Sequence, residues 1–143
     1  MFKQTLVATV AVYILWSIID FLVHGILLQS AYQETLHLWR SEDQMHALLM
    51  SGVTLFFGFS VVLAYGCFVA PKSVQTGLKF GAALGVGVGV GALTGLGSFS
   101  YMPIPLQLAA AWFAVNFVKL TLAGMIAGLL VKEPVTESGG STL

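Results

Sequence analysis

The sequence predicts an all-α fold, an integral membrane four-helix bundle with a short interfacial amphipathic helix between helices one and two. Of its 143 residues, 57% are hydrophobic and 8% are charged, whereas about a quarter of the residues of a soluble domain are charged. The apolar residues fall into four stretches, each near the roughly 20 residues that a membrane-spanning helix needs. This length allows one domain, residues 1–143.

The composition also excludes several classes of function. Six basic and six acidic side chains cancel, so no basic surface is expected for nucleic acid. The single cysteine, Cys67, excludes an internal disulfide and offers no metal cluster. Adjacent carboxylates occur at Glu42 and Asp43, where the start of a helix explains them. Because no nucleophile lies beside a plausible base, we expect neither an enzyme nor a bound cofactor.

The first apolar stretch, residues 5–28, is expected to be the first membrane helix. A cleaved signal peptide is the alternative, but the stretch exceeds the roughly 7–15 apolar residues of such a peptide, and no A-x-A site follows it. The stretch is interrupted by Asp20 and, one turn later, by His24.

Residues 30–45 are expected to form the amphipathic helix, lying in the headgroup region of the bilayer. Tyr32, Leu36 and Trp39 recur at helical spacing, with polar residues on the opposite face. Tyrosine and tryptophan are enriched at membrane interfaces, so these aromatic residues favour that placement.

A capping box is expected to start the second membrane helix, residues 45–70. In this interpretation Ser41 caps the helix and the side chain of Gln44 reaches back to it. His46 is then expected to contact a lipid headgroup or the cap, and Pro71 closes the span.

The third and fourth membrane helices are expected at residues 75–97 and 105–131. Pro105 can open the last helix, because proline is favoured at the first helical position. The tail, residues 132–143, is polar and is expected to be disordered.

The basic residues predict the orientation in the cell membrane. With the N-terminus inside, Lys3, Lys72, Lys79 and Lys132 lie on the cytoplasmic side, and Arg40 lies outside. This asymmetry follows the positive-inside rule, so both termini are expected to be cytoplasmic.

Glycine recurs at every fourth residue of the third span, which predicts ridges for close helix packing. The first ridge is Gly77, Gly81, Gly85 and Gly89, and the second begins with Gly91 and Gly95. Together the ridges cover roughly 200° of the helix circumference, enough for two neighbouring helices. A flexible gating helix is the alternative interpretation of so many glycines.

Ionisable residues inside a membrane are costly and usually face the interior of the bundle. Measured from the cytoplasmic ends, Asp20 lies about 22 Å deep and Lys119 about 18 Å deep, at 1.5 Å per residue. His24 lies one turn from Asp20, and Asn116 lies one turn from Lys119. The topology therefore predicts a polar cluster of Asp20, His24, Asn116 and Lys119.

Three roles are open to this cluster. It can be a buried ion pair that fixes the register of the first and last helices. It can be a proton or cation site, in which a desolvated Asp20 or His24 shifts its pKa. Binding of a metal or haem is the third role, but Asp20 and His24 supply two ligands, and no second histidine lies at the depth of His24.

Three segments carry a resemblance to a known family. They are DFLVHGILLQSAY at 20–32 with LHLWR at 36–40, the glycine-rich third span, and WFAVNFVKLTLAGMIAGLL at 112–130. They resemble the DUF1761 group of small four-helix membrane proteins, and the likeness covers most of the chain. The resemblance implies architecture and membrane location, and it implies no mechanism.

Two functions follow as expectations. The first is a structural or accessory membrane component in the lipid bilayer. It packs through its glycine-rich third helix and its lipid-facing surfaces, either against itself, as a homo-oligomer, or against a larger membrane complex. The second is a small transporter or ion-coupling protein that uses the polar cluster.

Overall fold

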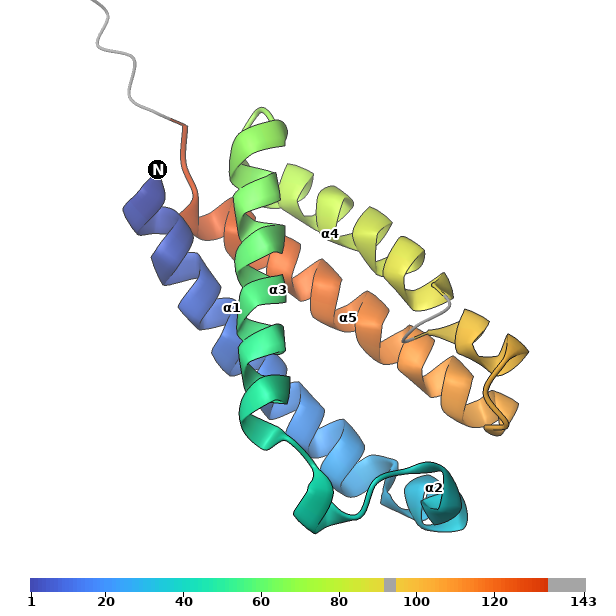
Figure 1. Ribbon diagram of the computed structural model, residues 1–143. Coiled ribbons are helices and arrows are strands. Elements are labelled where there is room, and N and C mark those ends of the chain that lie inside the picture. The colour runs from blue at the N-terminus through green and yellow to red at the C-terminus, as the bar shows by residue number, and fades with distance from the viewer. Residues whose placement is uncertain (92–94, 134–143) are drawn as a thin grey trace, which may run out of the picture.

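The computed structural model describes residues 1–91 and 95–133, and within these ranges its regular elements are all helical (Figure 1). The α-helices are α1 (Phe2–Leu22), α2 (Gln29–Glu34), α3 (Ala47–Phe68), α4 (Val74–Val90) and α5 (Leu106–Leu130). Single turns connect them: the π-helical η1 (Val23–Leu27) and the 3₁₀-helical η2 (Leu36–Leu38), η3 (Glu42–Gln44) and η4 (Leu96–Ser100).

Three helices are long and apolar enough to cross a membrane: Phe2–Leu27, which joins α1 to η1, then α3 and α5. The helix expected at 75–97 is shorter than predicted, because α4 ends at Val90 after 17 residues. At 1.5 Å per residue this is about 25 Å, short of the roughly 30 Å hydrocarbon core. The fold is thus helical as predicted, with three helices of spanning length and a fourth, shorter apolar helix.

The end of α4 corrects the prediction of a second glycine ridge. Gly91 takes an extended conformation, with φ −54° and ψ 153°, so it terminates the helix instead of continuing it. Gly95 approaches the carbonyl group of Gly89 so closely that a Cβ there would clash with its oxygen. Both glycines therefore allow the chain to turn sharply where α4 ends. Residues 92–94 lie outside the described residues.

The segment expected to be one amphipathic helix, residues 30–45, is instead broken into α2, η2 and η3. Helix α2 ends at Thr35, whose buried hydroxyl donates to the Ala31 carbonyl oxygen at 2.8 Å and accepts from the Trp39 indole at 2.9 Å. The predicted capping box at Ser41 is absent, since the Ser41 side chain makes no cap hydrogen bond. Side-chain contacts to the backbone therefore replace a continuous helix here.

The turn between α3 and α4 holds a capping box that the sequence analysis did not identify. The Ser73 hydroxyl accepts from the Thr76 amide at 3.1 Å, and the Ser73 amide donates to the Thr76 hydroxyl at 3.1 Å. The Tyr65 hydroxyl, at the end of α3, donates to the Ser73 carbonyl oxygen at 3.0 Å. These bonds satisfy free amides at the start of α4 and tie it to α3.

Helices α4 and α5 form the most extensive contact of the chain, and glycine makes that contact possible. A Cβ added at Gly77 or Gly81 would come closer than 3.0 Å to backbone atoms of α5. The buried glycines of α4 are Gly77, Gly81, Gly85 and Gly89. All four face α5, whereas Gly87 faces open space. The two predicted ridges together were expected to receive two helices, whereas the ridge in α4 receives one, α5.

Helices α1 and α3 pack on the remaining face of α5 (Figure 1). The core between them is formed by Ala8, Val12, Trp16, Val61, Val62, Tyr65, Leu120, Ala123, Ala127 and Val131. Helix α3 crosses α5 obliquely, so its N-terminal half diverges from α5 (Figure 1). The N-terminus, the α3–α4 turn and the end of α5 lie at the same end of the molecule (Figure 1).

The polar tail predicted at 132–143 begins with two residues that contact the helical body. The Lys132 amide donates to the Gln4 side chain at 3.3 Å, and the Lys72 amide donates to the Glu133 carboxylate at 2.8 Å. The rest of the tail, from residue 134, lies outside the described residues.

We expect Gly81→Ala to lower the unfolding free energy by about 1–3 kcal/mol, because the added methyl group must push α4 away from the backbone of α5. Gly87→Ala is the matched control, since a Cβ there meets nothing within 4 Å. This control should be neutral or stabilising by up to about 1 kcal/mol, the helix-propensity difference between alanine and glycine. Thermal unfolding in detergent micelles measures both, and equal effects would contradict the assigned packing.

Candidate functional site

An ion pair joins the first and last helices at the centre of the candidate site. The Lys119 ammonium of α5 donates to both carboxylate oxygens of Asp20 on α1, at 2.6 and 2.7 Å. The Lys119 side chain is 14% exposed and that of Asp20 is 32% exposed, so the pair lies at the edge of the helix interface. The structure therefore brings these two residues together, from positions 99 residues apart.

Trp16 is a third member of the site that the sequence analysis missed. Its ring is 1% exposed, and its indole N–H donates to the backbone carbonyl oxygen of Lys119 at 2.8 Å. The Lys119 ammonium also lies 5.1 Å from the centre of the ring, within the range of a cation–π interaction. One signal was available, because Trp16 precedes Asp20 by four residues and so shares its helix face.

A row of polar side chains continues from Asp20 toward α2. His24 Nε2 lies 3.8 Å from the Asp20 carboxylate, and His24 Nδ1 lies 2.6 Å from the Tyr32 hydroxyl. The Trp112 indole on α5 donates to the same hydroxyl at 2.9 Å. An indole N–H can only donate, so the Tyr32 hydroxyl accepts from Trp112. The Tyr32 hydroxyl then donates its own proton to His24 Nδ1, and each donor has an acceptor. The His24 proton then sits on Nε2, the nitrogen that faces Asp20.

The π-turn η1 explains why Tyr32 reaches His24. The Leu28 amide donates to the Val23 carbonyl oxygen at 2.8 Å, five residues back. One extra residue in a turn rotates the following chain by about 100° relative to a regular helix. Tyr32 was predicted to be an aromatic residue of the interface, and its hydrogen bonds to His24 and Trp112 could not be derived from its spacing.

Burial raises the pKa of the Tyr32 hydroxyl above its ordinary value, because the phenolate would be poorly solvated there. The negative charge of Asp20 raises the pKa further, while the hydrogen bond from Trp112 opposes the shift by stabilising the phenolate. Tyr32 therefore stays protonated well into the alkaline range and remains a donor in the row.

Asn116 lies near the ion pair. It lines a cavity of about 160 Å³ together with Trp16 and Lys119, next to Phe57 of α3. The other two histidines lie away from the site along the chain, and His46 accepts from Arg40 at 3.3 Å. Within residues 1–91 and 95–133, no group of three or more potential metal ligands of the His, Cys, Asp or Glu type is found.

These features define the class of the chain as an all-helical protein with three helices of membrane-spanning length and a charged pair between the first and the last. Comparison with protein-family models, with curated proteins and with solved structures finds no match. The resemblance to the DUF1761 group therefore stays a prediction.

The raised pKa of Tyr32 predicts a specific effect at high pH. A folded-state pKa above the ordinary value of 10.0 means that the folded protein holds this proton more tightly than the unfolded chain. Its contribution to stability is therefore complete below pH 10 and is lost as the pH rises through the folded-state pKa. Tyr32→Phe should cost about 1 kcal/mol near pH 7, for its lost hydrogen bonds.

The difference in unfolding free energy between the unsubstituted protein and Tyr32→Phe should shrink above pH 10, because only the unsubstituted protein loses the contribution of the Tyr32 proton. Chemical unfolding from pH 7 to pH 11 measures this difference. Tyr101→Phe is the control at an exposed tyrosine, since Tyr101 is 58% exposed. A Tyr32→Phe difference that does not change with pH would contradict the assignment.

Proposed function

We propose that this protein is a structural or accessory membrane component, in which Asp20 and Lys119 join the first and last helices. The single observation that carries the proposal is that Lys119 holds both oxygens of Asp20 while its backbone carbonyl accepts from Trp16. Three hydrogen bonds thus connect α1 and α5 at one level. Inside a membrane such a pair is costly to break, because the remaining charge loses its partner.

The packing of the helices supports a scaffold. The glycine ridge of α4 is used within the chain, against α5, so the contact that sets the closest helix spacing needs no second molecule. Large apolar side chains cover the outer faces of the helices, among them Leu48 at 89% and Phe56 at 71% exposure. These faces are the surfaces proposed to contact the lipid bilayer, another copy of the chain or a larger membrane complex.

The proposed location is the cell membrane, with both termini on the cytoplasmic side. The N-terminus, the α3–α4 turn and the end of α5 share one end of the molecule (Figure 1). Lys3, Lys72 and Lys132 belong to that end, and Arg40 belongs to the connection at the opposite end. This distribution agrees with an excess of basic residues on the cytoplasmic side.

No catalytic role is proposed. The Lys119 ammonium is paired as a cation with Asp20, and a lysine nucleophile must instead be a free amine. The row through His24 and Tyr32 ends on the Trp112 indole, which only donates a hydrogen bond.

A stabilising ion pair predicts an asymmetry between single and double variants. Lys119→Met should destabilise the protein by about 3 kcal/mol, because it leaves the Asp20 carboxylate without its cation. The double variant Asp20→Leu with Lys119→Met should recover much of this loss, since an apolar pair needs no partner charge. Thermal unfolding in detergent, with gel filtration to follow association, measures both. A double variant as unstable as the single one would contradict the structural role.

A second candidate function, proton or cation coupling, is favoured by the position of His24. Its Nε2 lies 3.8 Å from Asp20, too far for a direct hydrogen bond but near enough for a proton to pass through one water molecule. Histidine is also the side chain whose charge ordinarily changes between pH 5 and 8.

Reconstituted vesicles separate the two functions. For a structural protein we expect the decay of an imposed pH gradient to match that of protein-free vesicles, both for the native chain and for His24→Gln. The control is Cys67→Ser, which changes an exposed residue outside the row. Native protein that accelerates the decay, with the acceleration lost in His24→Gln and kept in Cys67→Ser, would establish coupling and refute the purely structural function.

A further inference from the structure

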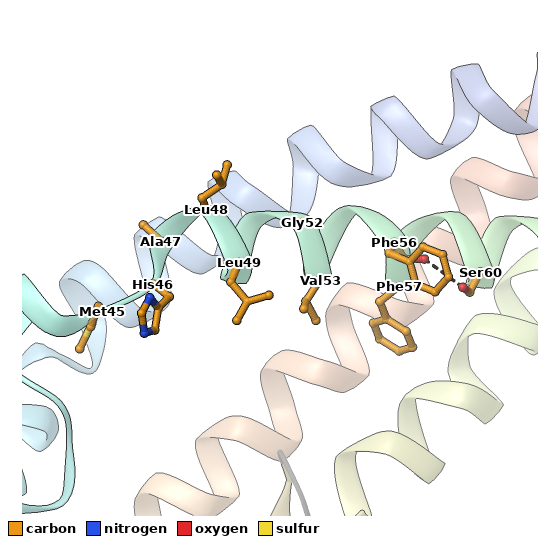
Figure 2. A pocket seen from close by; sticks show the side chains of 10 residues that line it. All are labelled: Met45, His46, Ala47, Leu48, Leu49, Gly52, Val53, Phe56, Phe57 and Ser60. Atoms are coloured by element: carbon orange, nitrogen blue, oxygen red, sulfur yellow. Dashed lines mark hydrogen bonds between the residues drawn. The ribbon is translucent and has the colours of Figure 1, made fainter.

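The N-terminal half of α3 forms one wall of an apolar groove. The buried residues of α3 are Gly58, Val61, Val62, Tyr65 and Gly66. All of them follow Phe57, so the first half of the helix contributes none. The groove, of about 1,070 Å³, lies along this half and is lined by residues between 45 and 60 (Figure 2).

One stripe of side chains lines the length of this groove. His46, Leu49, Val53 and Phe57 project from the same side of α3, and Leu48 projects from the opposite side (Figure 2). Leu49 is 64% exposed and Val53 is 60% exposed, so the stripe is largely uncovered. Ser60, at the far end, donates to the Phe56 carbonyl oxygen at 2.9 Å. The wall of the groove is therefore apolar from Leu49 onward.

The residues that precede the groove in the chain are polar and carry both signs of charge. His46 immediately precedes the apolar span Ala47–Phe68, and Arg40 donates to its ring at 3.3 Å. A guanidinium has five N–H groups, so pairing one with His46 leaves the capacity to hold two oxygens of a phosphate. Glu42 and Asp43 are exposed on η3, between Arg40 and His46 in the chain. They supply negative charge for a cationic group.

We propose that this groove binds a zwitterionic glycerophospholipid whose headgroup carries a phosphate and an amine. The phosphate binds Arg40 and His46, the amine lies near Glu42 and Asp43, and one acyl chain runs along Leu49, Val53 and Phe57. The two acidic residues outnumber Arg40, so a headgroup with both charges matches this end of the groove better than a purely anionic one.

The length of the stripe matches an acyl chain. From His46 to Phe57 the stripe is about 16 Å long at 1.5 Å per residue, close to half of the roughly 30 Å hydrocarbon core, which is the depth of one leaflet. A chain that follows the stripe from the polar end would therefore reach about the middle of the bilayer.

Lipid retention after detergent purification tests the proposal. The purified chain is exchanged into vesicles of phosphatidylethanolamine, of phosphatidylglycerol, or of either lipid with added diacylglycerol, then extracted and analysed by mass spectrometry with its lipids attached. We expect stoichiometric retention of phosphatidylethanolamine, and retention of the other two lipids lower by roughly tenfold or more. Equal retention of diacylglycerol would overturn the phosphate contact, and equal retention of phosphatidylglycerol would overturn the amine contact.

Two kinds of variant locate the bound lipid. Gly52→Trp places a large side chain in the groove, where an added Cβ meets nothing within 4 Å, and Gly87→Trp is the matched control in an equally open position on α4. Arg40→Gln removes the phosphate partner from an exposed position outside the helices. Gly52→Trp and Arg40→Gln should each lower phosphatidylethanolamine retention by roughly tenfold, and Gly87→Trp should leave it unchanged.

Three results would overturn the proposal. The first is that Arg40→Gln leaves the retention of phosphatidylethanolamine unchanged. The second is that Gly52→Trp and Gly87→Trp lose the lipid equally. The third is that Gly52→Trp keeps the lipid but loses the oligomeric state of the protein. The last result would assign the groove to a second copy of the chain. None of these measurements depends on the Asp20–Lys119 pair, so they test the groove separately from the proposed function.

Discussion

The backbone contact between α4 and α5 sets the positions of the other helices. Four glycines remove the side-chain layer from one face of α4, and the two helices approach until backbone atoms touch. Leu120 makes one of these contacts, through its carbonyl group at Gly81. Its neighbour Lys119 is thereby presented to the other side of α5, where α1 brings Asp20. The glycines therefore position the charged pair without contacting it.

Trp16 connects the charged pair to the apolar core. Its indole N–H satisfies a carbonyl group of α5, and its ring lies under the Lys119 ammonium and 5.6 Å from the ring of Phe57 on α3. One side chain of α1 thus contacts both other helices of spanning length. A buried tryptophan is suited to this, because it combines a large apolar surface with a single donor that needs one partner.

Two regions of different character meet along α3. Its C-terminal half is buried against α1 and α5 and belongs to the scaffold, whereas its N-terminal half leaves α5 and forms the groove. The groove and the small cavity beside Lys119 share Val53 and Phe57 as lining residues. An acyl chain in the groove would therefore lie next to the helices that carry the ion pair, and the proposed lipid site would meet the helix interface at Val53 and Phe57.

The helical class, the approximate positions of three long apolar helices, and the encounter of Asp20 with Lys119 were predictable from the sequence. They were predictable because helices of membrane-spanning length are expected to share one axis: residues at equal depth on neighbouring helices are candidates for contact, and a charge inside a membrane would require a partner. The ridge of Gly77, Gly81, Gly85 and Gly89 could be predicted for a similar reason, since residues four positions apart lie on the same face of a helix.

The other features depend on how the helices pack in three dimensions. The end of α4 at Val90, the division of residues 30–45 into short turns, and the row from His24 through Tyr32 to Trp112 all depend on contacts between distant segments. Residue spacing cannot reveal an extra residue in a π-turn. It also cannot show that the Trp39 indole donates a hydrogen bond to the Thr35 hydroxyl. Depth along one axis can be counted from a sequence, but rotation about that axis is set by packing, and rotation decides which side chains meet.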